Sequence, residues 1–531
     1  MVSMGRSLRA VGLMVVLTAW SGLAVIEGAT RGVTRPGPSS AEREGSPLAQ
    51  AATSPSTLSL SLRESIALAL ERNYDIRIEG YNPQIRAADV RNEQAEFDPA
   101  VVAGYNATGG RLRVDDDPRQ FRDRVNHTEV YTPSAGVEQR LQTGTRLALQ
   151  FSQDRIHSNQ RGSTSRLLEP SNEFRTTLNI TQPLLRNLGL DVNRTRIRVA
   201  RTNQEISENV LKDRIIGVVA RVQQLYWDLV FRLQELEVRR LSLKLAQDLL
   251  EQTRIQVTVG TLPQLSILEA EAGVAAREEA VILGENEVHT VEDRIKETLN
   301  LFERDREGER SIIPTTTPLF IVEETNLATA LQVAYEHRPD YRQARLEIES
   351  RTLNERFTRN QLFPTLDLQG RIGLNGLDRQ ADDALHDFTS GDMVFYQIGL
   401  AFRYPLGNQA AKSRFLRARL EVEQGKALLQ RLEERILVEV REAVRNVETN
   451  IKRVSVTRGA QELAQKKLEA EQKKLAVGLS TVREILRFQD DLSRAQSSEI
   501  RALTDYNTSQ ANLDRAKGTT LERLDISIGD R

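Results

Sequence analysis

Two segments of the chain, residues 191–258 and 409–476, each run for 68 residues without a proline. The first contains one glycine, Gly217, and the second contains Gly425 and Gly459. Because proline breaks a helix interior, both segments are predicted to be continuous helices, each extending for roughly 100 Å. Shorter helices are predicted at about 64–96, 262–300, 327–361 and 479–516. Two short helices stacked end to end match one long helix, which favours long helices packed antiparallel beside stacked short ones.

The apolar residues of the second long segment advance by 3, 4, 4, 3, 4, 4 and 3 positions. They are Leu429, Leu432, Ile436, Val440, Ala443, Val447, Ile451 and Val454. This eleven-residue repeat keeps an apolar stripe nearly parallel to the helix axis, or slightly right-handed, whereas a strict heptad winds left-handed. An ordinary amphipathic core stripe explains the same spacing over so short a window.

Several motifs occur twice, in the same order. LRESIALALERNYDI begins at Leu62 and LATALQVAYEHRPDY begins at Leu327. Later in each half, VGTLPQLSILEAE from Val259 parallels VGLSTVREILRFQ from Val477. A repeat of this length indicates a duplicated domain rather than a solenoid module.

The matches divide the chain into a first repeat, 58–313, a second repeat, 314–518, and a C-terminal tail, 519–531. Each repeat is predicted to run from a helix through strands to a long helix, a Val-Gly turn and a last helix. The strands are expected at about 99–184 in the first repeat and about 364–404 in the second. The fold class is therefore mainly α with β.

The N-terminus has the pattern of a secretory signal peptide over residues 1–29. Arg6 and Arg9 precede an apolar run, and Gly28 and Ala29 suit a cleavage site. An uncleaved membrane anchor is the alternative. Residues 30–57 are rich in Pro, Ser, Gly and Ala and are predicted to be a disordered linker. No later window reaches 18 consecutive apolar residues, so no later helix is expected to span a bilayer.

Composition excludes several classes of function. The chain has 73 Lys and Arg against 74 Asp and Glu, and this balance gives no reason to expect a nucleic-acid partner. It has no cysteine and only five histidines, without an HExxH motif, so disulfides, thiolate metal sites and cysteine nucleophiles are excluded. We expect no catalytic residue, no metal site and no cofactor. The many carboxylates stand beside Lys and Arg, which is typical of solvated helix faces.

Two strand segments alternate apolar and polar residues. From Val394 to Tyr404 every second position is apolar or aromatic, and Phe174–Ile180 follows the same pattern except at Thr176. The apolar set is Phe174, Leu178, Ile180, Tyr396, Ile398, Leu400, Phe402 and Tyr404. Half-buried soluble sheets also alternate in this way. Combined with the secretory signal, the pattern favours strands that face lipid in the outer membrane.

One chain offers four to six such strands, whereas bacterial outer-membrane barrels begin at eight. A sheet in lipid must close without edges, so closure requires several chains. The first repeat also carries a segment, 136–153, that has no counterpart in the second and that Thr143 and Gly144 suit to a hairpin. It is expected either to add two barrel strands per chain or to decorate one end. The polar segments 111–132 and 154–172 are expected to be extracellular loops.

With FPTL before the second strand pair, TQPLL and YPLG before the long helices, and VGLSTVREILRFQDDLSRAQ from Val477, the sequence resembles the TolC outer-membrane efflux family. The resemblance covers roughly 58–520. It implies a homotrimer with a β-barrel in outer-membrane lipid, continuous with a long α-helical tunnel in the periplasm. It also implies a periplasmic adaptor (membrane fusion protein) and an inner-membrane transporter of the RND, ABC or MFS class as partners, in a tripartite efflux pump or a type I secretion system.

The resemblance also implies functional residues. The Val-Gly turns correspond to the family's adaptor-docking tips: Val259, Gly260, Thr261 and Leu262 in one repeat, and Val477, Gly478, Leu479 and Ser480 in the other. Simple helix capping is expected of these glycines in any case. Glu484 matches a carboxylate of the tunnel entrance, while Arg487 stands where the family has a second acid. Glu484 would form a ring in the trimer, or only pair with Arg483, Arg487 or Lys474.

The leading expectation is therefore a passive export channel for small molecules or proteins, with no enzymatic activity. A periplasmic coiled-coil adaptor or scaffold is the alternative, in which the sheet would be a soluble domain without lipid-facing aromatics. No P-loop or GxGxxG motif is present, so the channel would have no energy source of its own.

Overall fold

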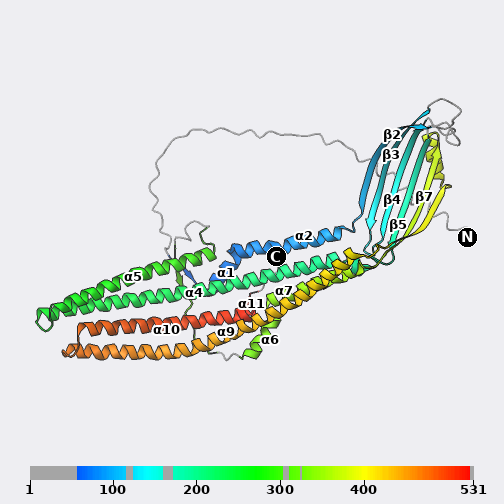
Figure 1. The fold of residues 1–531 in the computed structure, drawn as a ribbon. Coiled ribbons are helices and arrows are strands. Elements are labelled where there is room, and N and C mark those ends of the chain that lie inside the picture. The colour runs from blue at the N-terminus through cyan, green and yellow to red at the C-terminus, as the bar shows by residue number, and fades with distance from the viewer. Residues whose placement is uncertain (1–56, 115–123, 159–170, 303–309, 323–325, 527–531) are drawn as a thin grey trace, which may run out of the picture. The chain divides into compact units, whose positions relative to one another are not determined.

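The computed structural model describes residues 57–114, 124–158, 171–302, 310–322 and 326–526. Its longest helices are α4, Thr195–Thr258, and α9, Gln409–Ala476, with 64 and 68 residues (Figure 1). A one-turn helix, α3 (Leu190–Asn193), precedes α4 and is separated from it at Arg194. Neither long helix contains proline, which allows the hydrogen-bond ladder to continue without a break.

The helices that precede the strands are each broken once, at equivalent places in the two repeats. They are α1 (Leu62–Arg72) and α2 (Tyr74–Ala95) in the first repeat, and α6 (Leu327–His337) and α7 (Pro339–Asn360) in the second. Asn73 leaves the helical conformation and its side chain caps α2 by accepting from Asp75 and Ile76 N–H. Arg338 is extended because Pro339 follows it. The expected single helices over 64–96 and 327–361 are therefore corrected to pairs.

Each long helix turns back into an antiparallel partner. α5 (Leu265–Thr298) packs along α4, and α10 (Val482–Lys517) packs along α9 and also contacts α4 (Figure 1). Nearer the sheet, α2, α4, α7 and α9 contact one another in that order. The stripe of α9 is part of the core, since Ile436 and Val440 are fully buried.

A two-stranded parallel sheet, which the sequence patterns did not predict, joins the two repeats. It pairs β1 (Thr57–Leu60) with β6 (Ser311–Pro314). The buried hydroxyl of Tyr226 on α4 donates to the Leu60 carbonyl at 3.1 Å and accepts from the Thr316 N–H at 2.9 Å. These two bonds fasten the small sheet to α4.

The main sheet has six antiparallel strands in the order β2-β3-β4-β5-β7-β8 (Figure 1). They are β2 (Ala100–Val114), β3 (Arg124–Arg140), β4 (Arg146–Ser158), β5 (Ser171–Pro183), β7 (Thr365–Asp378) and β8 (Val394–Arg403). The segment 136–153 lies in β3, β4 and the turn between them. The extra hairpin thus adds strands to the same sheet.

The expectation that 111–132 and 154–172 form loops is wrong for their described parts. β2 continues to Val114, β3 starts at Arg124 and β4 continues to Ser158. Polar composition indicates exposure to water, and antiparallel backbone pairing can continue through such residues. Residues 115–123 and 159–170 lie outside the described ranges. A helix that was not expected, α8 (Ala381–Ser390), joins β7 to β8.

The predicted signal peptide, 1–29, and all of the predicted linker except Thr57 lie outside the described residues; Thr57 begins β1. In the tail, the short helix α11 (Thr520–Arg523) follows Gly518, and 527–531 lie outside the described ranges. Among the described residues, none of the helices is both long and apolar enough to cross a bilayer.

Candidate functional site

Strand register places the apolar residues of all six strands on one face of the sheet. One row runs across the whole sheet through directly paired residues: Val101, Val137, Leu149, Leu178, Ile372 and Tyr396. Because side chains alternate along a strand, the residues two positions away in each strand share this face. We call it the apolar face.

Much of the apolar face is exposed. Val101 and Tyr396 at its two edges are 83% and 80% exposed, and Ile398, Leu400 and Phe402 are also exposed. Monomeric soluble proteins rarely leave a contiguous apolar surface of this kind uncovered. The face is therefore suited to contact with lipid or with another apolar surface.

The eight residues expected to face lipid all lie on this side, or continue it at Tyr404. Phe174 differs from the others because it is only 8% exposed. Its ring lies against Phe151 of β4 and Phe388 of α8, with ring centroids 6.2 and 6.5 Å away. The sequence pattern could not reveal this cover, because α8 was not predicted.

The opposite face of the sheet is polar. One row across it consists of Glu138, Ala148, Asn179, Arg371 and Gln397. The guanidinium of Arg371 donates to the side-chain oxygen of Asn179 at 2.9 Å. The two faces thus differ as the lipid side and the water side of a membrane barrel do.

Both edges of the sheet are open. Among the described residues, β2 pairs only with β3 and β8 pairs only with β7. The helices below these edges also expose apolar side chains, at Ile78 and Ile85 on α2 and at Leu416 and Leu420 on α9. Unpaired strand edges and uncovered apolar helix faces together indicate surfaces that another chain completes.

The turn between β3 and β4 is fastened to the start of α4. Gly144 has φ +95°, and a Cβ there would lie 2.5 Å from the Asn187 carbonyl oxygen. Arg140 pairs with Glu96 and donates to Asn193 at 2.9 Å. The extra hairpin is therefore built into the junction between sheet and helices.

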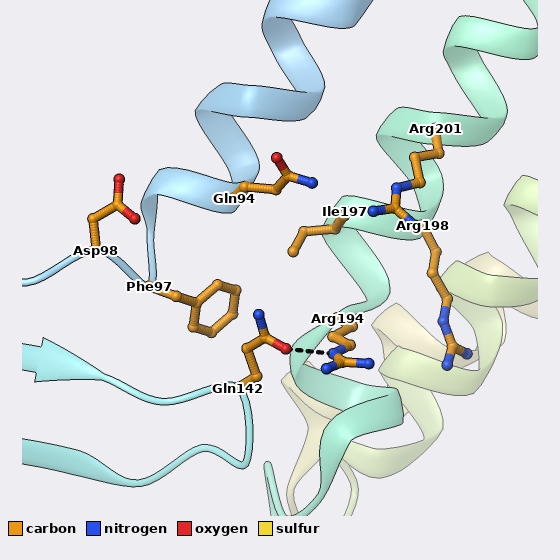
Figure 2. Close-up of a pocket in the computed structure, with 8 residues that line it drawn as sticks. All are labelled: Gln94, Phe97, Asp98, Gln142, Arg194, Ile197, Arg198 and Arg201. Carbon is orange, nitrogen blue, oxygen red and sulfur yellow. Dashed lines mark hydrogen bonds between the residues drawn. The ribbon is translucent and has the colours of Figure 1, made fainter.

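Figure 2 shows a hollow beside this junction. Arg194 donates to Gln142 at 2.7 Å across it. The lining residues are Gln94, Phe97, Asp98, Gln142, Arg194, Ile197, Arg198 and Arg201. Sequence reasoning had singled out none of them, because an arginine near a helix start gives no distinctive signal.

The two Val-Gly turns have the same backbone geometry. Gly260 and Gly478 have φ +81° and +76°, in the left-handed region that glycine adopts without penalty. Gly260 N–H donates to the Val257 carbonyl, and Thr261 N–H donates to the Gln256 carbonyl. The second turn repeats both bonds, from Gly478 to Leu475 and from Leu479 to Lys474. Both are Schellman motifs, which satisfy the last carbonyls of a helix.

The tips expose apolar side chains beside these glycines. Val259 is 73% exposed in the first tip, and Val477 and Leu479 are 69% and 77% exposed in the second. Leu262 is half-buried against the apolar cluster above the tips. Ser480 donates to Glu471 at 2.6 Å, and this bond, followed by that of Lys474, lowers the pKa of Glu471.

Glu484 and Arg487 both lie in the first turns of α10, next to the second tip. Their side chains approach to 3.9 Å and remain largely exposed. Arg483 instead contacts Glu269 of α5 at 2.5 Å, and Lys474 contacts Glu471 at 3.0 Å. Of the three partners considered for Glu484, only Arg487 is near it among the described ion pairs.

A buried arginine joins the two helical hairpins above the two tips. The guanidinium of Arg277 on α5 donates to Asp490 at 2.8 Å and to the Leu486 carbonyl at 3.1 Å, both on α10. It also donates to Ser242 of α4 at 3.1 Å. The Arg277 side chain is 9% exposed. No sequence signal marks it, since an arginine among glutamates is typical of a solvated helix face.

Within the described ranges, no group of His, Cys, Asp or Glu is arranged to hold a metal ion. The described features of the site are one apolar face, one polar face, two open edges and two exposed tips.

Comparisons with known proteins agree with this arrangement. The family model described as "Outer membrane efflux protein" matches residues 65–301 and 330–519, one segment in each repeat. The sequence has no significant match among curated proteins.

Several solved structures share the fold. The outer-membrane channel OprN has a TM-score of 0.63 and 15% identity, covering 86% of this chain and 90% of that one. The outer membrane protein VceC from Vibrio cholerae has a TM-score of 0.61 and 15% identity, with coverage of 86% and 96%. A membrane protein from Pseudomonas aeruginosa has a TM-score of 0.63 and 16% identity, with coverage of 90% and 99%.

Proposed function

The chain belongs to the outer membrane efflux protein family, and from that premise we propose how copies of it build the channel. It is an outer-membrane efflux channel with its helical tunnel in the periplasm. The alternative of a periplasmic adaptor has no support from these comparisons. The family and its solved neighbours are channels rather than enzymes.

We propose that three copies close one barrel through their open edges. β2 and β8 run in opposite directions, because five antiparallel pairings separate them. β8 of one copy can therefore pair with β2 of the next and keep the alternation around the ring. Six strands from each of three copies make eighteen strands, which suffices for a water-filled barrel.

The helices below the sheet support the same closure. Ile85 lies ten residues before the end of α2, and Leu420 lies eleven residues after the start of α9. Both helices meet the sheet at these ends, so the exposed stripes lie at similar heights. Burying such side chains would stabilise the trimer by roughly 1.5–3 kcal/mol each.

The tips are the proposed docking surface for a periplasmic adaptor, which would connect the channel to an inner-membrane transporter. Each tip presents an exposed valine on a backbone that needs no partner to hold its shape, because the Schellman bonds are internal. A preorganised apolar knob loses little entropy on binding.

The entrance is proposed to close through contacts between the two hairpins. Arg277 with Asp490 and Arg483 with Glu269 hold α10 against α5. Opening would separate these groups. Three copies of Glu484 near the second tip would then place carboxylates around the aperture and favour cations.

The row of apolar residues across all six strands carries the proposal of a lipid-facing barrel. Ile398→Arg on the apolar face and its neighbour Gln397→Arg on the polar face test it. Arginine facing lipid costs about 2–4 kcal/mol per copy, whereas arginine in a wet lumen is tolerated. We expect heat-modifiable trimers in outer-membrane fractions for wild type and Gln397→Arg, and few or none for Ile398→Arg. Trimer loss from Gln397→Arg alone would show that the two faces are reversed.

A further inference from the structure

Helix α8 lies on the apolar face of the sheet, not on the polar one. Phe388 contacts Phe151 edge-on, with ring centroids 5.9 Å apart, and also contacts Phe174. Both strand residues belong to the apolar face by register. Ala384, one turn before Phe388, is fully buried.

A glycine allows this close packing. Gly376 of β7 is paired with Phe174 and so belongs to the same face. A Cβ at Gly376 would lie 2.2 Å from the Ala384 carbonyl oxygen and 2.4 Å from the Phe388 nitrogen. Only a residue without a side chain lets the backbone of α8 rest on the strand.

The apolar face ends where α8 lies. The next row beyond Phe174 on that side is mainly polar and consists of Ala107, Tyr131, Arg155, Asn172 and Asp378. From Leu366 near the helices to Gly376 under α8 there are ten residue steps along β7. At roughly 3.4 Å per step and a tilt of about 40° these rise about 26 Å, close to the ~25 Å apolar band of outer-membrane barrels.

The surface of α8 that turns away from the sheet is divided. Leu385 is 44% exposed and follows Ala384 by one position, roughly 100° around the helix. Asp383 is exposed and Asp387 is half-buried, and each lies roughly 160° around the helix from Leu385. A helix with one apolar flank and one acidic flank, lying across the border of an apolar band, has the character of an interfacial helix.

We propose that α8 binds outer-leaflet lipid, lying at the boundary between hydrocarbon and headgroups with Leu385 toward the acyl chains. This inference depends on the proposed lipid-facing barrel. The lipid that contacts α8 is continuous with the lipid that covers Tyr396 and Ile398. In this arrangement α8 does not line the lumen. The helix then marks the upper limit of the membrane around each copy.

The chain contains no cysteine, so single cysteines can be spin-labelled in the full-length channel without background substitutions. We would label Leu385→Cys on the proposed lipid flank and Asp383→Cys on the acidic flank. In proteoliposomes, power-saturation EPR compares the collision rates of each label with oxygen, which concentrates in lipid, and with a water-soluble nickel chelate. We expect oxygen to dominate at 385 and nickel to dominate at 383.

Two reference sites separate failure of this inference from failure of the barrel. Ile398→Cys lies in the apolar band, and Leu265→Cys lies exposed at the start of α5, next to the first tip. Oxygen dominance at 398 with nickel dominance at 385 would overturn the lipid role of α8 and leave the barrel standing. Nickel dominance at both would overturn the lipid-facing sheet itself.

Gly376→Val tests the packing of α8 on β7. Its side chain would displace α8, so the label at 385 should become mobile and shift toward nickel accessibility, while the trimer persists. Gly399→Val is the matched control, because a Cβ at Gly399 has no heavy atom within 4 Å. An unchanged label in a correctly assembled Gly376→Val trimer would contradict the packing of α8 on β7.

Discussion

The two hairpin tips have the same backbone conformation but differ in the side chains around it. Gly260 and Gly478 make the same pair of hydrogen bonds at nearly the same φ. After the first tip, α5 starts at Leu265, and its N-cap residue Gln264 makes no side-chain capping bond. After the second, the hydroxyl of Thr481 caps α10 and Glu484 stands in its first turn.

This contrast indicates that the two repeats contribute differently to docking and gating. Duplication explains the common backbone conformation, since a glycine in the left-handed region ends each long helix and lets the chain turn back. The ionisable groups of the second tip lie on α10 and at the end of α9, with Glu269 and Arg277 of α5 as their partners from the first repeat. We therefore expect both tips to matter for docking and the second hairpin to matter more for gating.

Charged substitutions at the tip glycines should have the largest effect. Gly260→Glu and Gly478→Glu each place a charge on the apolar knob, at a backbone cost of about 1–2 kcal/mol from the positive φ. Losing an interface hot spot of about 2–4 kcal/mol weakens binding roughly 30- to 700-fold. We expect export to be lost in cells while the trimer remains.

The matched control for these changes is Gly459→Glu, a helical glycine of α9 with open space around it. Glutamate is a good helix former, so export should be unchanged there. Loss of the trimer in the tip variants would instead assign those glycines a folding role. If only one tip variant lost export, docking would be confined to that repeat.

The comparison of repeats also shows what the sequence alone could predict. Absence of proline located α4 and α9 closely, and alternation from Phe174 and Val394 identified the residues that share one face of β5 and β8. The break at Asn73 was missed because asparagine is tolerated within helices, and its capping role depends on local geometry. β1 and β6 were missed because four-residue strands carry almost no periodic signal.

Contacts between segments that are distant in the sequence were the main feature that could not be predicted. Arg277 and Asp490 are 213 positions apart and meet only once both hairpins have packed. In the sequence each is one charge among many on a helix face. Gly376 gave no signal either, because its importance depends on a helix that packs on it from eight residues further along the chain.

Weakening the contacts between hairpins should have the next largest effect. Arg277→Ala removes a buried guanidinium with charge-assisted bonds, each worth about 1.5–3 kcal/mol. Shifting that free energy moves a closed-to-open equilibrium roughly ten- to hundredfold. Arg483→Ala removes an exposed pair worth about 1 kcal/mol or less, so its shift should stay below about fivefold. The open probability of purified trimers in planar bilayers measures the shift caused by each variant. Equal shifts would contradict the proposal that Arg277 contributes more than Arg483 to holding the entrance closed.

The smallest expected effect concerns ion selectivity at the second tip. Glu484→Gln removes a carboxylate from each copy and should reduce cation preference, whereas Arg487→Gln removes a nearby positive charge and should increase it. Both side chains are well exposed, so each change should alter the permeability ratio by less than about fivefold. Reversal potentials in a KCl gradient give the ratio. Because the Debye length falls to about 3 Å at 1 M salt, both shifts should fade there. Shifts of the same sign in the two variants, or none at low salt, would remove Glu484 from the entrance and leave it as an ordinary residue of a solvated helix face.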